Sequence, residues 1–455
     1  MSAKVEIMKT KAEQSIAQHF ADKVDLLASG AADAESRRAA FARFLEYGLP
    51  HRRIEAWKYT DLRNALGDVD MPAFGEAPTV DESRLNEALG PLGSLDAYRA
   101  VFVNGRFDNA LSALPETAGI AIRPLSGLDG GSDAPVDQAP VDQALEEALS
   151  VQSIVALNTA FLTDGLNVSL ADGVRLDKPL MIITVRAGGR DILVTTRHRV
   201  EVGAGAGMTL IEAAVSADGT AGQANSYVSL DIHAGASLEH AKIGTGDSAA
   251  VSDLATSRVK LDREAYYRAH QLTPGAPLSR NQVFVTFDGE DAELDFTSAV
   301  LGNGSDHIDS TIVVEHRAPG CKGRELFKAV LDDRARAVCQ GKVIVQRDAQ
   351  KTDGKQMAQA LMLSEDCEFD SKPELEIYAD DVACGHGSTS AEIDADLIFY
   401  CRSRGIPEAE AKVMLTESFI AEAIDNVDHD GLRDAMGEIV RTWLADNHSS
   451  AKTAL

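Results

Sequence analysis

The sequence predicts a mainly β fold, with a long β region flanked by α-helical regions at both ends. Between about Gly165 and Val382, short segments of alternating apolar and polar residues follow one another with few helical stretches. Before and after this region, apolar residues recur at helical spacing instead. We therefore expect an N-terminal helical domain over 1–95, a β core over 96–390 and a C-terminal helical domain over 391–455.

The N-terminal region contains two clear helical patterns. Apolar residues at helical spacing predict helices over Ala12–Leu27 and Glu35–Tyr47, and Gly48 and Pro50 end the second. The following stretch, Arg52–Arg63, mixes basic and aromatic residues. We interpret it as a packing and salt-bridge surface of the helical domain.

Composition and charge narrow the classes of partner. The chain has 455 residues, 44% of them hydrophobic, and a formal net charge of −27. This acidity argues against nucleic acid and against anionic membranes, both of which need basic surface. The N-terminal residues have no apolar signal region, and no apolar run is long enough to span a membrane. We therefore expect a cytoplasmic protein without a membrane segment.

The chain enters the β region through a hairpin, a loop and a helix. The segment Arg99–Asn109 predicts a hairpin around Asn104 and Gly105. A stretch rich in Gly, Ser, Asp and Pro, with a tandem APVDQ duplication, predicts an exposed loop over 127–145. A short helix is expected over Glu146–Phe161.

An internal repeat favours a β-solenoid. The pattern of Val200–Met208 recurs in Leu230–Leu238 and, more weakly, in Val285–Leu294, at a spacing that we interpret as two or three coils. Small residues in the turns would let successive coils stack at strand separation. An antiparallel sandwich has similar short strands, so this pattern alone leaves both architectures open.

The C-terminal region is predicted to form three helices. A first helix over Asp396–Arg404 ends at Gly405, and Pro407 is well placed to begin the second. In the last helix Leu432, Met436, Ile439, Val440, Trp443 and Leu444 follow helical spacing closely. Such a face most often packs on its own domain.

The best candidate site lies where the β region ends. Cys384 and His386 are separated by one residue, so an extended chain points the thiol and the imidazole to the same face. Gly385 and Gly387 would leave the other face bare and open to a second backbone. The end of a solenoid has unpaired strand edges. We therefore hypothesise that a partner chain pairs with the edge of the strand that carries Cys384 and His386. From these residues alone, a structural Cys–His pair is the favoured interpretation.

The remaining cysteines and histidines are expected to be structural. No CxxC motif occurs, so neither a disulfide framework nor a zinc ribbon is indicated. We expect Cys321, Cys339, Cys367 and Cys401 in the core. Most of the other strand-region histidines should be hydrogen-bonded structural residues: His198, His233, His240, His270, His307 and His316. A GxxxxGK[ST] loop is absent from the sequence, so any ATP chemistry must come from a partner.

Several long motifs resemble one family. The segments KPELEIYADDVACGHG (372–387), FYCRSRGI (399–406) and AQKTDGKQMAQALMLS (349–364) are similar to the SufB/SufD family of the SUF iron–sulfur cluster assembly machinery. RRIEAWKYTDLR (52–63) is similar to the SufD side of that family rather than to SufB. The resemblance implies a right-handed parallel β-helix, which decides between the two architectures above.

The resemblance also implies a function and partners. It implies a non-catalytic scaffold subunit that pairs with SufB through the end of the β-helix, or forms a homodimer when alone. The SufC ATPase would bind the C-terminal helices, roughly Asp394–Leu444. His386 becomes the favoured ligand, and Cys384 the second, for transient iron or an iron–sulfur cluster shared with the partner chain.

Two alternatives remain. A SufB-type primary cluster scaffold would resemble this chain, but many SufB proteins carry N-terminal cysteines and no cysteine precedes Cys321 here. A β-helical carbohydrate-active enzyme would need clustered carboxylates. The pairs Asp332–Asp333 and Asp380–Asp381 alternate faces if extended, so they do not form such a cluster.

Overall fold

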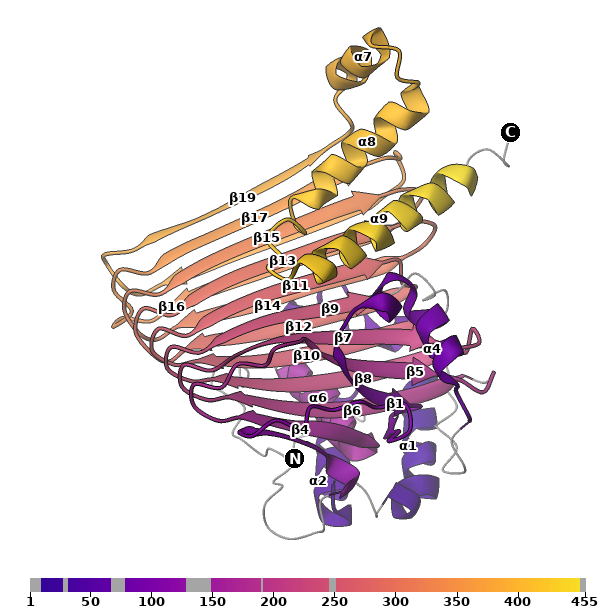
Figure 1. The fold of residues 1–455 in the computed structure, drawn as a ribbon, viewed down its shortest axis with the longest axis vertical. Coiled ribbons are helices and arrows are strands. Elements are labelled where there is room, and N and C mark those ends of the chain that lie inside the picture. Colours follow the sequence, from indigo (N-terminus) through magenta and orange to yellow (C-terminus); the bar gives the residue numbers. More distant parts are fainter. Residues whose placement is uncertain are drawn as a thin grey trace, which may run out of the picture.

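The computed structural model describes residues 10–27, 32–66, 78–127, 149–189, 191–244 and 251–450. It shows a β-solenoid with the N-terminal and C-terminal helices packed on the outer faces of its sheets, so the mainly β prediction is confirmed (Figure 1). The tandem duplication of the predicted loop lies outside the described residues. Among the residues described, none of the helices combines the length and the apolar composition that crossing a membrane requires.

Successive strands of the solenoid alternate between two facing sheets. One sheet, called sheet A here, contains β1 (Tyr98–Val103), β2 (Arg106–Phe107), β5 (Leu180–Arg186), β7 (Gly207–Ser216), β9 (Ser237–Gly244), β11 (Tyr266–Pro274), β13 (Glu293–Gly302), β15 (Lys322–Leu331), β17 (Asp353–Met362) and β19 (Ala383–Ala391). Sheet B contains β3 (Ile120–Pro124), β4 (Asp164–Leu170), β6 (Ile192–Val202), β8 (Gly222–Ile232), β10 (Val251–Leu261), β12 (Leu278–Phe287), β14 (His307–His316), β16 (Arg336–Val345) and β18 (Glu368–Ile377). The ladders are parallel except for β1–β2 and β3–β4.

The internal repeat marks adjacent coils, so the expected spacing of two or three coils is wrong for the strong pair. Val200 is the ladder partner of Leu230, and Met208 is the partner of Leu238. One coil is therefore the distance between the two strong repeats. The weaker echo at Val285 lies two coils beyond Leu230, because Val259 stands between them.

The solenoid interior is a continuous apolar core. Side chains that alternate along both sheets fill it, among them Leu238, Leu294, Phe296 and Val314. Turns between the strands use small residues and backbone with positive φ, as at Gly205 and Gly235. Each coil buries its apolar side chains against those of the neighbouring coils, and this burial stabilises it.

The N-terminal region contains helices that pack on both sheets, most of them on the outer face of sheet B. They are α1 (Lys11–Lys23), η1 (Val24–Leu27), α2 (Ala34–Tyr47), η2 (Glu55–Trp57), α3 (Leu62–Ala65), α4 (Glu82–Leu89) and η3 (Gly90–Ser94), joined by η4 (Leu125–Gly127) and α6 (Leu149–Phe161). Phe20, Phe41 and Phe161 form one cluster with Leu254 and Leu278 of the sheet. By contrast, α4 and η3 pack toward sheet A. The predicted hairpin is confirmed, with Asn104 and Gly105 in the turn.

The C-terminal helices leave the last coil and return to sheet A. They are α7 (Ala395–Ser403), α8 (Glu408–Ala421) and α9 (Asp430–Ser450), and Figure 1 shows α9 lying across several coils while α7 protrudes. Leu432, Met436 and Val440 of α9 are buried with outward-facing residues of sheet A. The predicted packing of this apolar face on its own domain is therefore confirmed.

Candidate functional site

Cys384 and His386 lie on the last strand of the solenoid. Their strand, β19, pairs with β17 on one side only, in a parallel ladder that places Cys384 beside Gly354 and His386 beside Gln356. Ladder partners in a parallel sheet project to the same face. Gln356 is an interior residue, because its amide lies over Gly341 of the opposite sheet. Both candidate side chains therefore project toward the interior side of the open end.

The two side chains differ in their surroundings. Cys384 is half-buried against the apolar core, and burial raises the pKa of its thiol, although Lys355 acts in the opposite direction. His386 is exposed, because β19 is the terminal strand of its sheet and none of the described residues form a further coil over it. The arrangement presents a protonated thiol and an accessible imidazole on one strand face, as the spacing predicted.

The outer face of β19 is only partly bare. A Cβ on Gly385 would have nothing within 4 Å, whereas a Cβ on Gly387 would meet the Cε of Met357 at 2.8 Å. A cleft of about 430 Å³ borders these glycines and is also lined by Arg324, Lys355 and Asn426. The expectation that both glycines leave open space is therefore wrong at Gly387.

Both sheets end here with an unpaired edge. The N–H of Ala383 bonds to Thr352 of the preceding coil, so by strand alternation the backbone groups of Cys384, His386 and Ser388 point to the free edge. In β18, the N–H of Glu368 bonds to Ala335 of the preceding coil, so the backbone of every second residue after Phe369, including Pro373, points to the free edge. Proline has no N–H to donate there. The free edge of β19 thus offers backbone hydrogen-bond donors and acceptors to a partner strand, and the free edge of β18 offers fewer donors.

The apolar core continues to this open end without a cap among the described residues. Phe369, Leu375, Val382 and Cys384 are only partly buried, yet they pack against the main core. Ile377 is exposed. An end of this kind matches the surface of another solenoid coil, because it carries an apolar interior and a free ladder edge together.

Behind the candidate ligands lies a polar column that the motif alone did not reveal. Glu325, Gln356 and His386 are successive ladder partners on β15, β17 and β19. Gln356 Nε2 donates to Glu325 Oε2 at 2.7 Å. Burial raises the pKa of Glu325 to about 8. Neither Gln356 nor Glu325 is among the site residues that the sequence predicts.

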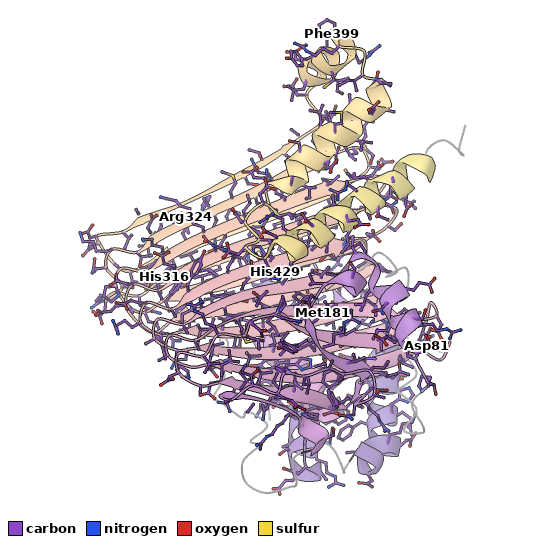
Figure 2. The ribbon with its side chains drawn as sticks, viewed as in Figure 1. Asp81, Met181, His316, Arg324, Phe399 and His429 are labelled. Carbon is purple, nitrogen blue, oxygen red and sulfur yellow. The ribbon has the colours of Figure 1, made fainter. Side chains whose placement is uncertain are left out.

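A further buried histidine borders this column. His316, at the end of β14, is stacked on Phe287, and burial lowers its pKa to about 4. Its two ring nitrogens have no hydrogen-bond partner. Figure 2 shows His316 on the same side of the solenoid as Arg324, the neighbour of Glu325. His316 is thus an exception to the prediction that most histidines of this region are hydrogen-bonded.

Other histidines do follow that prediction. His240 bridges Glu212 and Tyr267 inside the solenoid, at 2.7 and 2.9 Å. His233 contacts Asp262 and Glu201 on the surface. These residues are structural.

The other cysteines also separate into two groups. Cys321, Cys339 and Cys367 are buried, as expected. Cys401 lies half-buried on the protruding helix α7, so its expected place in the core is wrong.

The described residues contain no group of three or more His, Cys, Asp or Glu arranged to hold a metal ion. Cys384 and His386 alone would supply two donors, whereas iron in clusters usually has four ligands. The acidic pairs considered for a carbohydrate-active enzyme lie at turns, where Asp333 has a positive φ and Asp381 bonds to Lys351. Neither pair stands on a strand face.

A second unpartnered surface lies on α7. None of its residues is buried, and Leu397, Phe399 and Tyr400 are exposed large apolar side chains. Phe399 is 72% exposed. Figure 2 shows it at the tip of the molecule. Met414 of α8 is exposed as well. Together, Leu397, Phe399, Tyr400 and Met414 form the surface called the α7–α8 patch below.

Comparison with known proteins identifies the family of this chain. Residues 185–419 match the family model "SUF system FeS cluster assembly, SufBD core domain", and residues 10–182 match "SufBD protein N-terminal region". The chain is 32% identical over 394 residues to the Escherichia coli iron–sulfur cluster assembly protein SufD, which covers 86% of this chain and 88% of that protein. It is 30% identical to an iron–sulfur cluster assembly SufBD family protein of Synechocystis, over 83% of this chain and 84% of that one. It is also 27% identical to SufD of Bacillus subtilis, over 37% and 38% of the two chains. The chain therefore belongs to the SufB/SufD family of the SUF iron–sulfur cluster assembly machinery, on its SufD side.

Proposed function

We propose that this chain is a non-catalytic scaffold subunit for iron–sulfur cluster assembly. Its open solenoid end docks against the corresponding end of a SufB-type partner. Cys384 and His386 then supply two ligands to iron, or to a forming cluster, that both chains share. The observation that carries this proposal is the placement of both donors on the uncapped edge strand, beside an exposed extension of the core.

The chemistry of the two donors suits this role. A thiolate and a neutral imidazole are both ligands of iron in clusters. Because burial raises the pKa of Cys384, the resting group is a thiol, and metal binding displaces its proton. The partner and inorganic sulfide would complete the coordination.

The α7–α8 patch suits a second partner, the SufC ATPase of the same machinery. The apolar face of α9 already packs on sheet A, so α7 and α8 carry the exposed apolar surface of this region. Exposed apolar patches of this kind mark protein interaction sites. ATP-driven dimerisation of SufC would pull on this tail and open the interface at the solenoid end, a two-state change of the kind used in switching.

The cysteines favour a reducing compartment. All five are free, although Cys384 and Cys401 are partly accessible. Free accessible thiols are typical of cytosolic proteins. We place the assembly in the cytoplasm on this basis.

Anaerobic reconstitution of the co-purified complex tests the site. We expect His386→Ala to lower the iron and sulfide content and the visible absorption, while gel filtration shows an intact complex. His233→Ala, a half-exposed histidine on the outer surface, serves as the matched control and should leave the cluster unchanged. A full cluster in an intact His386→Ala complex would return this strand to a structural role.

Pull-down with SufC tests the second surface. Phe399→Asp should weaken SufC capture and leave the melting temperature almost unchanged, since exposed substitutions change stability by about 0.5 kcal/mol or less. Capture of SufC at the wild-type level by this variant would exclude the α7–α8 patch as the docking surface.

A further inference from the structure

Three polar side chains inside the last coils have buried atoms without a hydrogen-bond partner. The Oε1 atom of Glu325, the Oε1 atom of Gln356 and both ring nitrogens of His316 are buried without a hydrogen bond. Glu325 is 3% exposed and His316 is 0% exposed. Buried polar atoms without partners are costly and uncommon in folded proteins, so each requires an explanation.

These groups border one interior space. A Cβ on Gly323 would lie 3.7 Å from His316 Nε2 and 4.0 Å from Glu325 Oε1, so the two atoms approach the same point from opposite sheets. The Gln356 amide is bonded to the other oxygen of Glu325. Room for an additional atom therefore exists between His316 Nε2 and Glu325 Oε1, and the Gln356 amide lies beside this pair through its bond to Glu325.

Glycines connect this space with the open end. Gly323, Gly354 and Cys384 are successive ladder partners on the interior side. A Cβ on Gly354 would lie 3.6 Å from Cys384 Sγ. Earlier coils carry Tyr267 and Leu294 in the same column. The interior thus changes from bulky apolar side chains to glycines as it approaches the candidate ligands.

The donor set fits a divalent transition metal. One imidazole nitrogen, one carboxylate oxygen and one amide oxygen form a mixed nitrogen and oxygen set, and imidazole with carboxylate is a ligand combination of Fe²⁺. A purely alkaline-earth ion would favour oxygen ligands alone. The groups come from three strands, β14, β15 and β17.

We propose that His316, Glu325 and Gln356 form an inner Fe²⁺-binding site, two coils behind the shared site at the open end. This inference rests on the proposed function, because it assigns a place to the iron that enters past Cys384 and His386. Binding would release the proton of the Glu325 carboxyl group, and no electron is transferred. The iron is cargo that passes between the two sites.

Metal titration of the isolated full chain tests this site without the partner. Co²⁺ is the spectroscopic probe, since thiolate ligation gives intense charge-transfer absorption and a nitrogen and oxygen site gives only weak visible bands. We expect the Cys384→Ala/His386→Ala variant to retain one Co²⁺ with the weak bands. Adding Glu325→Gln or His316→Phe should then weaken its binding about tenfold or more. Equilibrium dialysis with Fe²⁺ under anaerobic conditions should give the same pattern.

The variants should not lose metal by unfolding. Glu325→Gln removes a buried acid, and His316→Phe removes two unpartnered nitrogens from a ring stacked on Phe287, so both should fold at least as well as the wild type. Glu212→Gln, at a buried acid already bonded to His240, is the matched control and should bind Co²⁺ normally. Absence of Co²⁺ binding in the Cys384→Ala/His386→Ala variant, or equal binding after Glu325→Gln and His316→Phe, would overturn the inner site. Loss of clusters on His386→Ala in the complex would still support the proposed function.

Discussion

At the scale of single residues, Glu325 makes the stability of the metal-free chain depend on pH. Burial raises its pKa to about 8 from an ordinary 4.5, and the hydrogen bond from Gln356 offsets only part of this effect. The folded chain therefore retains a proton that the unfolded chain releases above pH 4.5. Stability contributed by this group is complete below pH 4.5 and is lost as the pH rises through about 8.

Glu325→Gln should remove this dependence. The unfolding free energy of the wild type should fall with pH and that of the variant should not. The difference between them should therefore shift by on the order of 3 kcal/mol in favour of the variant from pH 5.5 to pH 8.5. Urea unfolding with a chelator present at both pH values measures the difference. His316 and His198, whose pKa values burial lowers to about 4, titrate in both proteins and cancel in the comparison. A constant difference between wild type and variant across this range would show that Glu325 ionises normally.

A buried ion pair attaches the N-terminal motif to sheet B. Arg280 and Asp309 are both fully buried and bonded, and Arg280 Nη2 donates to the Ala56 carbonyl at 2.7 Å. The guanidinium lies 3.9 Å from the centroid of the Trp57 ring. Thr60 Oγ1 donates to Asp309 at 2.5 Å. The basic and aromatic segment is thus a packing surface, as predicted, with the solenoid as the surface it packs against.

Arg280→Ala should destabilise the chain by about 3–5 kcal/mol, because it leaves a buried carboxylate without its cation. Urea unfolding followed by tryptophan fluorescence measures this, since Trp57 loses its neighbouring charge. The double variant Arg280→Met/Asp309→Leu removes both charges and should recover most of the loss. Equal destabilisation in the single and double variants would contradict the explanation.

At the scale of elements, alternation along the strands could be read from sequence, but stacking between coils could not. Cys384 and His386 share a face because their spacing is two, a local property. Glu325 meets Gln356 only through the register of separate coils, and it shares its space with His316 only because β14 and β15 face each other across the interior. The repeat at Val200 was visible, yet its interpretation depended on which strands pair, and the structure alone shows one coil per repeat.

Edge alternation in β19 makes a test by paired proline substitutions possible. Ser388→Pro removes a donor from the free edge and should leave the pairing with β17 intact. Thr389→Pro removes a donor that faces β17 and should destabilise the last coil. In co-purification with the SufB-type partner, Ser388→Pro should lose the partner while its melting temperature stays close to that of the wild type. Retained partner in this variant would exclude backbone pairing along β19.

At the scale of the whole molecule, stability should be unequal along the solenoid. Each inner coil contacts its two neighbours, and the N-terminal helices cover the outer face of sheet B as far as β12. Helix α9 covers outward residues of sheet A over the middle coils. The last strands, β18 and β19, have a neighbour on one side only and contain no fully buried residues. Opening should therefore begin at the end that carries the site.

Hydrogen exchange followed by mass spectrometry checks this gradient. In the isolated chain, peptides from β18 and β19 should exchange fastest among the strands, and those from β8 to β14 slowest, because local opening follows the number of stabilising neighbours. Addition of the SufB-type partner should slow exchange in β18 and β19, whereas addition of SufC should slow it in α7 and α8. Since the two partners act on different elements, each protection pattern identifies its own surface. Uniform exchange along the solenoid, or protection of its first coils by the SufB-type partner, would place the interface elsewhere.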